Sequence, residues 1–515
     1  MFHRGSSTGQ LSPRTVLDRG RMLTCPWLVM ESAKRAHTRR LSRAPPVPVP
    51  NAVGKNVEMR RFALAVMGSG SGNMLIPEHP DGPVAIIEHG TFGGTCINRG
   101  CIPSKMLLRA ADVASGAAHA GTFGVGVTVT GVDWPAIRDR VFATTDGVSC
   151  DGRDYRRRQD GVTLFEGSAR FVGPRTLAVG DETLQADQVV IATGSSPVVP
   201  PVFAGAGVEV HTSDTVMRLA ALPASMIIVG GGYVAVEQAH LFSSLGVEVT
   251  VIEAADRLLP GMDTGVADRF TDLAGKRWTL ALGTAVAEVG PDDGGVAVTT
   301  EDGRSFAAGT LLVATGRRAN TGDLDVDAAG IGLTNDGRIE VDRYGRAAEG
   351  VWALGDCASP HPLKHVANAE ARTIAHNLGH PDDLRPLPHE AVPSAVFSEP
   401  QVASVGARRQ DLEGVDHVVA STPFGDVAYG WALRDDSGFC TIYADPRTGR
   451  LLGAHIIGPD AALLLTPLVQ ALAHGQRAAD LARGQYWIHP ALSEVVEQTL
   501  LALDVDQTVR SGQVH

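Results

Sequence analysis

The hydrophobic residues of this chain occur in short runs, several of which end in glycine clusters. Residues 61–73, RFALAVMGSGSGN, place an apolar run before one such cluster, and residues 226–237, MIIVGGGYVAVE, repeat the pattern. Apolar runs of this length bounded by glycine are typical of strands that are buried on both faces. A second apolar run follows each turn and ends in an acid, PVAIIE at Glu88 and VEVTVIE at Glu253. The pattern predicts two βαβ units of the dinucleotide-binding type.

Further strands close on small residues. Residues 189–197, VVIATGSSP, and 311–320, LLVATGRRAN, are near-repeats, and residues 350–358, GVWALGDCA, end another apolar run at Asp356. Small residues at a strand end let the chain pass close to a bound cofactor, although a plain exit from a strand into a turn is the alternative. Asp356 has two interpretations, a hydrogen-bond partner for a polyol chain or a cap for the helix predicted just after it.

The pattern changes after about residue 390. Residues 394–406, 439–445 and 451–458 read as strands, residues 461–475 read as an apolar-faced helix, and no glycine fingerprint occurs. We therefore predict an α/β protein with two Rossmann-like dinucleotide-binding domains and a C-terminal α+β domain. The expected boundaries are 59–205 and 321–388 for the two parts of the first domain, 206–320 for the second, and 389–508 for the third.

Length and charge limit the possible functions. A chain of 515 residues needs more than one core, and its net charge of −12 argues against nucleic acid or anionic lipid as a partner. No apolar run approaches the length that spans a bilayer. We expect a cytoplasmic protein that binds neither nucleic acid nor membrane. Residues 1–58 are basic and rich in Pro and Ser, which predicts a disordered tail, a transit peptide, or a start of translation that really lies at Met59.

The two glycine turns predict nucleotide sites. In the first, Gly68 and Gly70 have the regular spacing, but Asn73 stands where a third Gly or Ala is usual, and Gly72 is added. In the second, Gly230-x-Gly232-x-x-Ala235 fits the fingerprint. Glycines let the backbone approach a pyrophosphate, whose charge then lies at a helix N-terminus. Two such units imply two nucleotides, or an adenine-bearing cofactor together with a pyridine nucleotide.

The cysteine pair is the most informative chemistry in the chain. Of six cysteines, only Cys96 and Cys101, in GTFGGTCINRGCIPSK (90–105), lie close together. In a reducing compartment such a pair is metal-binding or catalytic, and no second Cys or His pair closes a tetrahedral metal site. A helix N-terminus would lower the pKa of the thiol, whereas a pair of buried free thiols is the alternative. Near the C-terminus, His489 and Glu494 have the spacing of an oriented base, or of a surface histidine before a helix.

Taken together, these motifs resemble the pyridine nucleotide–disulfide oxidoreductases over about residues 60–505. The resemblance implies tightly bound FAD, NAD(P)H as electron donor, a homodimer and a small-molecule disulfide as substrate. It implies that Cys96 attacks the substrate, that Cys101 faces the flavin, and that His489, oriented by Glu494, serves the partner subunit's cysteines. Lys105, paired with Glu237, would lie at the flavin's reducible nitrogen.

The resemblance also assigns cofactor-binding residues. For FAD they are Gly68, Gly70, Gly72, Glu88, Gly94, Thr95, Lys105, Thr193, Gly194 and Asp356. For NAD(P) they are Gly230, Gly232, Tyr233, Glu253, Arg257 and Gly316. Tyr233 is similar to the aromatic residue that covers the flavin until nicotinamide arrives.

Several stretches, including 68–73, 363–372 and 482–497, resemble the mycothione reductases within this family, which favours mycothiol disulfide as substrate. Dihydrolipoamide dehydrogenase is the alternative within the family, and a redox-silent flavoprotein sensor is the alternative outside this class of enzymes. Glu253 would accept a ribose 2′-hydroxyl and repel a 2′-phosphate, with Arg257 offsetting it in part. We therefore expect NADH to be used at least as well as NADPH.

Overall fold

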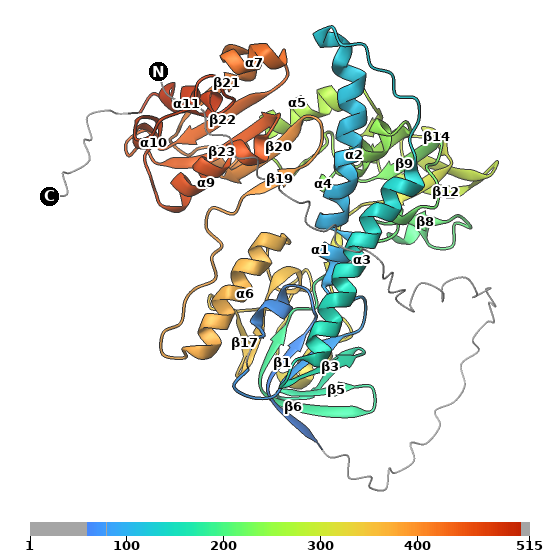
Figure 1. The fold of residues 1–515 in the computed structure, drawn as a ribbon, viewed down its shortest axis with the longest axis vertical. Helices are drawn as coiled ribbons and strands as arrows, with labels where there is room; N and C mark the ends of the chain where they lie inside the picture. The colour runs from blue at the N-terminus through green and yellow to red at the C-terminus, as the bar shows by residue number, and fades with distance from the viewer. Residues whose placement is uncertain (1–58, 79, 506–515) are drawn as a thin grey trace, which may run out of the picture. The chain divides into compact units, whose positions relative to one another are not determined.

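The computed structural model describes residues 59–78 and 80–505, so the expected N-terminal tail lies outside the described residues. The predicted fold class is confirmed, because two sheets with parallel cores are followed by an antiparallel sheet (Figure 1).

The first sheet is built around the strand that leads into the first glycine turn. Its order is β17 (Arg346–Ala348), β18 (Val351–Ala353), β6 (Glu182–Ile191), β1 (Arg60–Met67), β2 (Val84–Glu88) and β3 (Val162–Glu166), with the hairpin β4 (Ala169–Gly173) and β5 (Thr176–Val179) beside β6. The pairs β18–β6, β6–β1, β1–β2 and β2–β3 are parallel. Their carboxyl ends therefore lie at one edge, where the turns after the strands meet.

Helices accompany this sheet. They are α1 (Gly94–Arg99), α2 (Cys101–His119), α3 (Trp134–Arg158) and α6 (Lys364–Gly379). The first glycine turn, however, leads only into the five-residue 3₁₀ helix η2 (Ser71–Leu75), where the sequence pattern predicts an α-helix. Pro77, Pro80 and Pro83 follow within a few residues, and proline cannot donate the hydrogen bonds that a longer helix would need.

The second sheet is fully parallel. Its order is β11 (Thr279–Leu282), β10 (Glu248–Glu253), β9 (Ser225–Val229), β15 (Thr310–Val313) and β8 (Val210–His211). The helix α4 (Tyr233–Ser244) begins directly after the second glycine turn, and α5 (Thr264–Ala274) follows β10. A meander of β12 (Val286–Asp292), β13 (Gly295–Thr300) and β14 (Ser305–Ala308) precedes β15. The strands β7 (Ser195–Pro197) and β16 (Arg317–Ala319) pair with each other where the chain enters and leaves the region of the second sheet.

The third sheet is antiparallel. Its order is β19 (Ser394–Val396), β20 (Gln401–Gly406), β23 (Leu451–Gly458), β22 (Phe439–Ala444) and β21 (Val418–Pro423). The helices around it are α7 (Ala428–Leu433), α8 (Ala461–Leu464), α9 (Thr466–Ala473), α10 (Ala478–Arg483) and α11 (Glu494–Leu501). The single helix predicted over 461–475 is thus two helices, and Pro467 lies at the start of the second.

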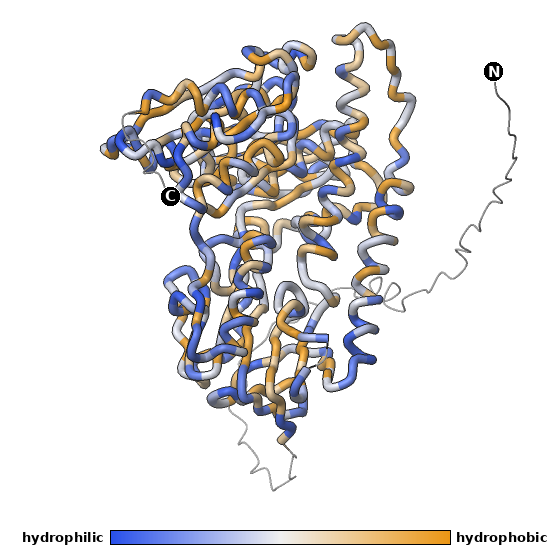
Figure 2. Tube along the Cα trace, turned by 60° about the vertical axis from the view of Figure 1, so that its left-hand side comes forward, coloured by the Kyte–Doolittle hydropathy of each residue, from blue (hydrophilic) through white to orange (hydrophobic). Residues whose placement is uncertain are grey.

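Apolar packing connects these units. One cluster of buried residues contains Leu107 of α2, Trp134 of α3, Phe242 of α4 and Ile457 of β23. The Trp134 and Phe242 rings lie 5.9 Å apart. Hydrophobic stretches of the chain trace run through the strands, whereas hydrophilic ones gather at outer turns and helix ends (Figure 2). The helix that starts with Cys101 is therefore held against the other two sheets.

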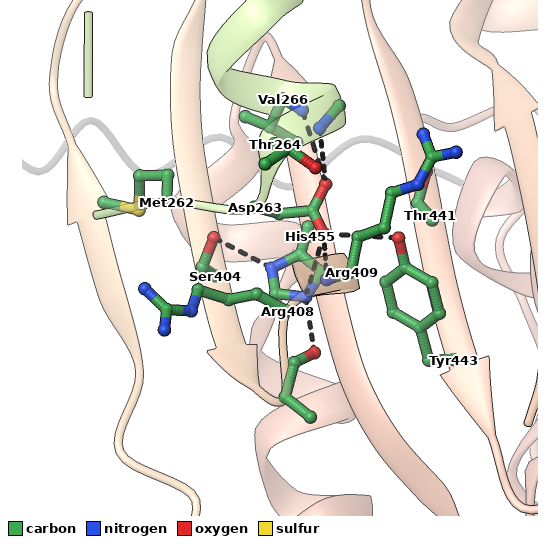
Figure 3. A network of polar contacts seen from close by, with 12 residues as sticks. Met262, Asp263, Thr264, Val266, Ser404, Arg408, Arg409, Thr441, Tyr443 and His455 are labelled. Carbon is green, nitrogen blue, oxygen red and sulfur yellow. Dashed lines mark hydrogen bonds and ion pairs between the residues drawn. The ribbon is translucent and has the colours of Figure 1, made fainter. Parts of the chain in front are cut away.

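A polar network joins α5 to the third sheet (Figure 3). Asp263, which is 1% exposed, accepts hydrogen bonds from the backbone N–H of Gly265 at the start of α5 and from the N–H of Arg409 at 2.7 Å. Tyr443 donates its hydroxyl to the same carboxylate at 3.2 Å. His455 lies beside it and is bonded to Ser404 Oγ at 3.0 Å. Because both oxygens of Asp263 are used, its burial is compensated.

We predict that Asp263→Ala destabilises the protein by about 2–4 kcal/mol, since it removes a helix cap and leaves buried donors unpaired. Tyr443→Phe, which removes one donor, should cost about 1 kcal/mol. Thermal and urea unfolding midpoints would measure both effects. A midpoint for Asp263→Ala equal to that of the wild type would contradict the prediction.

Candidate active site

The two cysteines lie on either side of a helix break. Cys96 is in α1, Cys101 begins α2, and Gly100 separates the helices. A Cβ on Gly100 would lie 3.0 Å from the carbonyl oxygen of Thr95, so glycine permits this close turn. Asn98, which is buried, donates to the carbonyl oxygens of Phe92 and Gly94 at 2.9 Å and braces the loop before Cys96.

The two thiols differ in acidity. A hydrogen bond from Cys96 lowers the pKa of Cys101 to about 7, and the nearby charge of Lys105 lowers it further against the effect of burial. The same hydrogen bond and burial raise the pKa of Cys96, while the charge of Lys364 acts in the opposite direction. Of the two thiols, Cys101, the first residue of α2, is therefore the one that ionises first.

An ion pair between a partly exposed lysine and a buried glutamate lies next to the cysteines. Lys105 Nζ is 2.7 and 2.6 Å from the two carboxylate oxygens of Glu237, which is 6% exposed. Glu237 also accepts the backbone N–H of Phe397 at 3.0 Å, and the Lys105 ammonium lies 4.7 Å from the centre of the Phe397 ring. Two segments distant in sequence, α4 with Glu237 and the chain at Phe397, thus hold the lysine of α2 in one position.

A cavity of about 1200 Å³ contains the cysteine pair and the first glycine turn. Predicted FAD-binding residues that line it are Gly68, Gly70, Glu88, Gly94, Thr95, Lys105, Thr193, Gly194 and Asp356. Gly72 instead packs behind the turn, where a Cβ would lie 2.8 Å from Val66 and from Ala192. Glu88 accepts from the N–H and hydroxyl of Ser69 and from the N–H of Gly90, so its carboxylate also holds the turn in place.

The unusual Asn73 has a structural partner. Arg156 of α3, which is 8% exposed, donates to the Asn73 side-chain oxygen at 2.8 Å and to its carbonyl oxygen at 3.0 Å. Arg156 also reaches the carbonyl oxygen of Ile76. The arginine therefore satisfies carbonyl groups where the short helix η2 ends.

A second cavity of about 420 Å³ lies at the second glycine turn. Gly230, Gly232, Tyr233, Glu253 and Gly316, all predicted NAD(P)-binding residues, line it. Arg257 is not among its lining residues. Its guanidinium instead pairs with Asp256 at 2.9 Å and with Asp268 at 2.6 Å.

The predicted pair His489–Glu494 is hydrogen-bonded, and His489 lies outside the cavity that holds the cysteines of its own chain. His489 Nδ1 is 2.8 Å from Glu494 Oε1, and this hydrogen bond lowers the pKa of Glu494. The His489 side chain is 72% exposed, and His489 is not among the described residues that line the larger cavity.

Sequence reasoning missed other residues of the cavity. Arg317 lies in both cavities and donates to Ser195 Oγ at 2.8 Å, while Ser195 donates to Asp356 at 2.6 Å. Lys364 donates to Ser71 Oγ at 2.8 Å. Arg317 follows Gly316 directly, and Lys364 lies in the stretch 363–372, but only the fold brings them to the turns.

The geometry agrees with comparisons to known proteins. A family model described as pyridine nucleotide-disulphide oxidoreductase matches residues 62–373, and the model of that family's dimerisation domain matches residues 392–500. The chain belongs to this family. As a member it is an FAD- and NAD(P)H-dependent disulfide oxidoreductase that carries the family's dimerisation domain.

Individual relatives cover most of the chain. Mycothione reductase from Mycobacterium tuberculosis is 45% identical over 460 residues, which are 86% of this chain and 100% of the relative. Dihydrolipoyl dehydrogenase from Halobacterium salinarum is 36% identical over 84% of this chain and 94% of the relative. Among solved structures, the HOCl-induced flavoprotein disulfide reductase RclA from Escherichia coli matches with a TM-score of 0.76 and 25% identity, over 86% of this chain and 100% of that one.

The larger cavity fits the FAD that the family uses. A Cβ on Gly94 would lie 2.8 Å from Gly70 Cα, and a Cβ on Gly68 would lie 2.3 Å from the carbonyl oxygen of Ala192. Bare backbone therefore lines the floor of the cavity at the first turn, as close approach of a pyrophosphate requires. No helix in the described part of the chain is long and apolar enough to cross a bilayer.

We predict that removing the charge of Lys105 raises the pKa of Cys101 above about 7. At pH 7 the ionised fraction of Cys101 should then fall below about one half. Differential alkylation of the reduced protein across pH, followed by mass spectrometry, would measure this. Because the charge of Glu237 itself raises the pKa of Cys101, Lys105→Met is made together with Glu237→Gln and compared with Glu237→Gln alone, and the exposed Lys276→Met is the control for a distant charge. An unchanged titration of Cys101 would refute the electrostatic effect.

Proposed function

We propose that the protein reduces mycothiol disulfide with NAD(P)H through the Cys96–Cys101 pair. The observation that carries the proposal is the cysteine pair in one cavity with Lys105 and the first glycine turn, in a chain 45% identical to a mycothione reductase. Overall, NAD(P)H and one proton convert one disulfide into two thiols. Bound FAD supplies the two-electron relay between the nucleotide and the cysteines.

The two thiols divide the work according to their acidity. Cys101, whose pKa is about 7, carries negative charge first and faces the flavin. Cys96 needs a base, since burial and Cys101 raise its pKa. His489 of the partner subunit, oriented by Glu494, is that base. This arrangement accounts for a histidine that is exposed in its own chain and lies on the C-terminal unit.

The thiol exchange then takes two steps. The Cys96 thiolate attacks one sulfur of the substrate, the substrate's S–S bond breaks, and the leaving thiolate takes a proton from the imidazolium of His489. The Cys101 thiolate next attacks the sulfur of Cys96, which restores the Cys96–Cys101 bond and releases the second substrate thiolate, and this thiolate takes its proton from solvent. Lys105 stays fixed by Glu237 beside the flavin.

The remaining assignments are also proposals. For FAD they are Gly68, Gly70, Gly72, Glu88, Gly94, Thr95, Thr193, Gly194 and Asp356, and for NAD(P) they are Gly230, Gly232, Tyr233, Glu253 and Gly316. Arg257 is the weakest of the predicted set, because its guanidinium already pairs with two aspartates.

Substrate assays test the function directly. We expect kcat/KM for mycothiol disulfide to exceed that for glutathione disulfide and for lipoamide by about two orders of magnitude. Faster turnover of lipoamide would favour dihydrolipoamide dehydrogenase, which the 36% identity to such an enzyme keeps as the second candidate. Cys96→Ser should abolish disulfide turnover but leave flavin reduction by nucleotide intact. Cys150→Ser, at a cysteine outside the cavity lining, is the matched control.

The choice of nucleotide is a separate prediction. Glu253 lines the second cavity while Arg257 does not, so NADH should be used at least as well as NADPH. Glu253→Gln should improve the NADPH to NADH ratio of kcat/KM about tenfold by removing like-charge repulsion. The exposed Glu288→Gln is the control. A strong preference of the wild type for NADPH in steady-state kinetics would disprove this prediction.

A further inference from the structure

The two glycine turns lead into helices of different length. The second turn leads into α4, with 12 residues, whereas the first leads into η2, with five residues of 3₁₀ helix. The positive end of a helix arises from several aligned peptide groups, and it is this end that favours a phosphate. A single short 3₁₀ turn provides little of it. The first glycine turn therefore lacks the partial positive charge that the N-terminus of α4 provides at the second turn.

A lysine from a distant part of the chain reaches the first turn. Lys364, the first residue of α6, donates its ammonium to Ser71 Oγ at 2.8 Å. Ser71 is 9% exposed and in turn donates to Asn368 Oδ1 at 3.0 Å. This chain of hydrogen bonds fixes the ammonium against the turn Gly68–Gly72. Lys364, Ser71 and Asn368 all line the larger cavity.

Lys364 also differs from the other cations of the cavity. Four lysine and arginine residues line it. Three are in ion pairs: Arg99 and Arg317 with Asp214, and Lys105 with Glu237. Within the described residues, Lys364 has a hydroxyl group but no carboxylate as partner. Its ammonium thus forms no ion pair with a carboxylate of residues 59–78 or 80–505.

The other cation at this turn cannot replace it. Arg156 is bonded to Asn73, Ile76 and Gln159 and is not among the residues that line the cavity. At the second turn, in the described part of the chain, no lysine or arginine side chain donates to residues 230–232. A lysine contact is therefore found at the turn that lacks the long helix.

We propose that Lys364 binds the pyrophosphate of FAD and replaces the positive helix end that the first glycine turn lacks. The pyrophosphate would lie on the bare backbone of Gly68 and Gly70, with the ammonium held beside it by Ser71. This proposal rests on FAD binding by the family and not on the identity of the disulfide substrate.

Release of FAD from the holoenzyme, followed by flavin fluorescence, tests the proposal. We expect Lys364→Gln to release FAD about tenfold faster than the wild type, because one charge–charge contact is lost. Lys364→Arg should stay near the wild-type rate, and the exposed Lys276→Gln is the matched control for charge. Wild-type release should accelerate with ionic strength, and Lys364→Gln should be less sensitive to it. The wild-type salt dependence remains a test even if Lys364→Gln does not fold.

Other outcomes would overturn the proposal. They are an unchanged release rate in Lys364→Gln, equal acceleration in Lys364→Arg, or wild-type release that is insensitive to salt. If Lys364→Gln changed the reduction potential of the flavin without releasing FAD faster, the ammonium of Lys364 would lie at the flavin ring and not at the pyrophosphate. Because no disulfide is present in these measurements, failure of the substrate assignment leaves their result intact.

Discussion

Much of the structure around the cysteines depends on one buried carboxylate. The carboxylate of Glu237 in α4 accepts hydrogen bonds from the ammonium of Lys105 in α2 and from the backbone N–H of Phe397, just after β19. A carboxylate at 6% exposure is tolerated only when its oxygens are occupied, so these partners must all be in place together. The helix that carries Cys101 is thereby fixed against both the second sheet and the C-terminal unit. The apolar cluster of Leu107, Trp134 and Phe242 reinforces the same arrangement.

The sequence was most informative where a local pattern has a local cause. Apolar runs ending in glycine predicted the strands β1 and β9, and the spacing of Cys96 and Cys101 singled them out as the one close pair among the six cysteines. It failed at the first turn because the fingerprint alone predicts a helix after Gly70, whereas Pro77, Pro80 and Pro83, only a few residues further along, limit it to Ser71–Leu75. Which of the two thiols is the more acidic could not be predicted from the sequence, because it depends on the hydrogen bond between them and on the charges of Lys105 and Lys364.

Departures from the usual fingerprint have matching partners elsewhere in the fold. Asn73 replaces a small residue and binds Arg156, which satisfies carbonyl groups at the end of the short helix. Ser71 lies two residues earlier and binds Lys364. Neither partner could be assigned from the sequence, since α3 and α6 are separated from the turn by long stretches of chain. The first turn is therefore a locally weakened motif that side chains from two remote helices support.

The residues that stabilise the first turn and the cavity wall lie late in the sequence, and this has a consequence for biosynthesis. Gly355 at the cavity donates its N–H to Glu370 at 2.7 Å, and Glu370 in turn contacts His389, so the cavity wall itself needs residues far along the chain. A nascent polypeptide emerging from the ribosome therefore cannot complete this cavity when the first glycine turn appears. It must wait until α6 and the linker after it have been translated and have docked. Flavin loading is thus expected late in synthesis, when most of the catalytic chain has already left the exit tunnel.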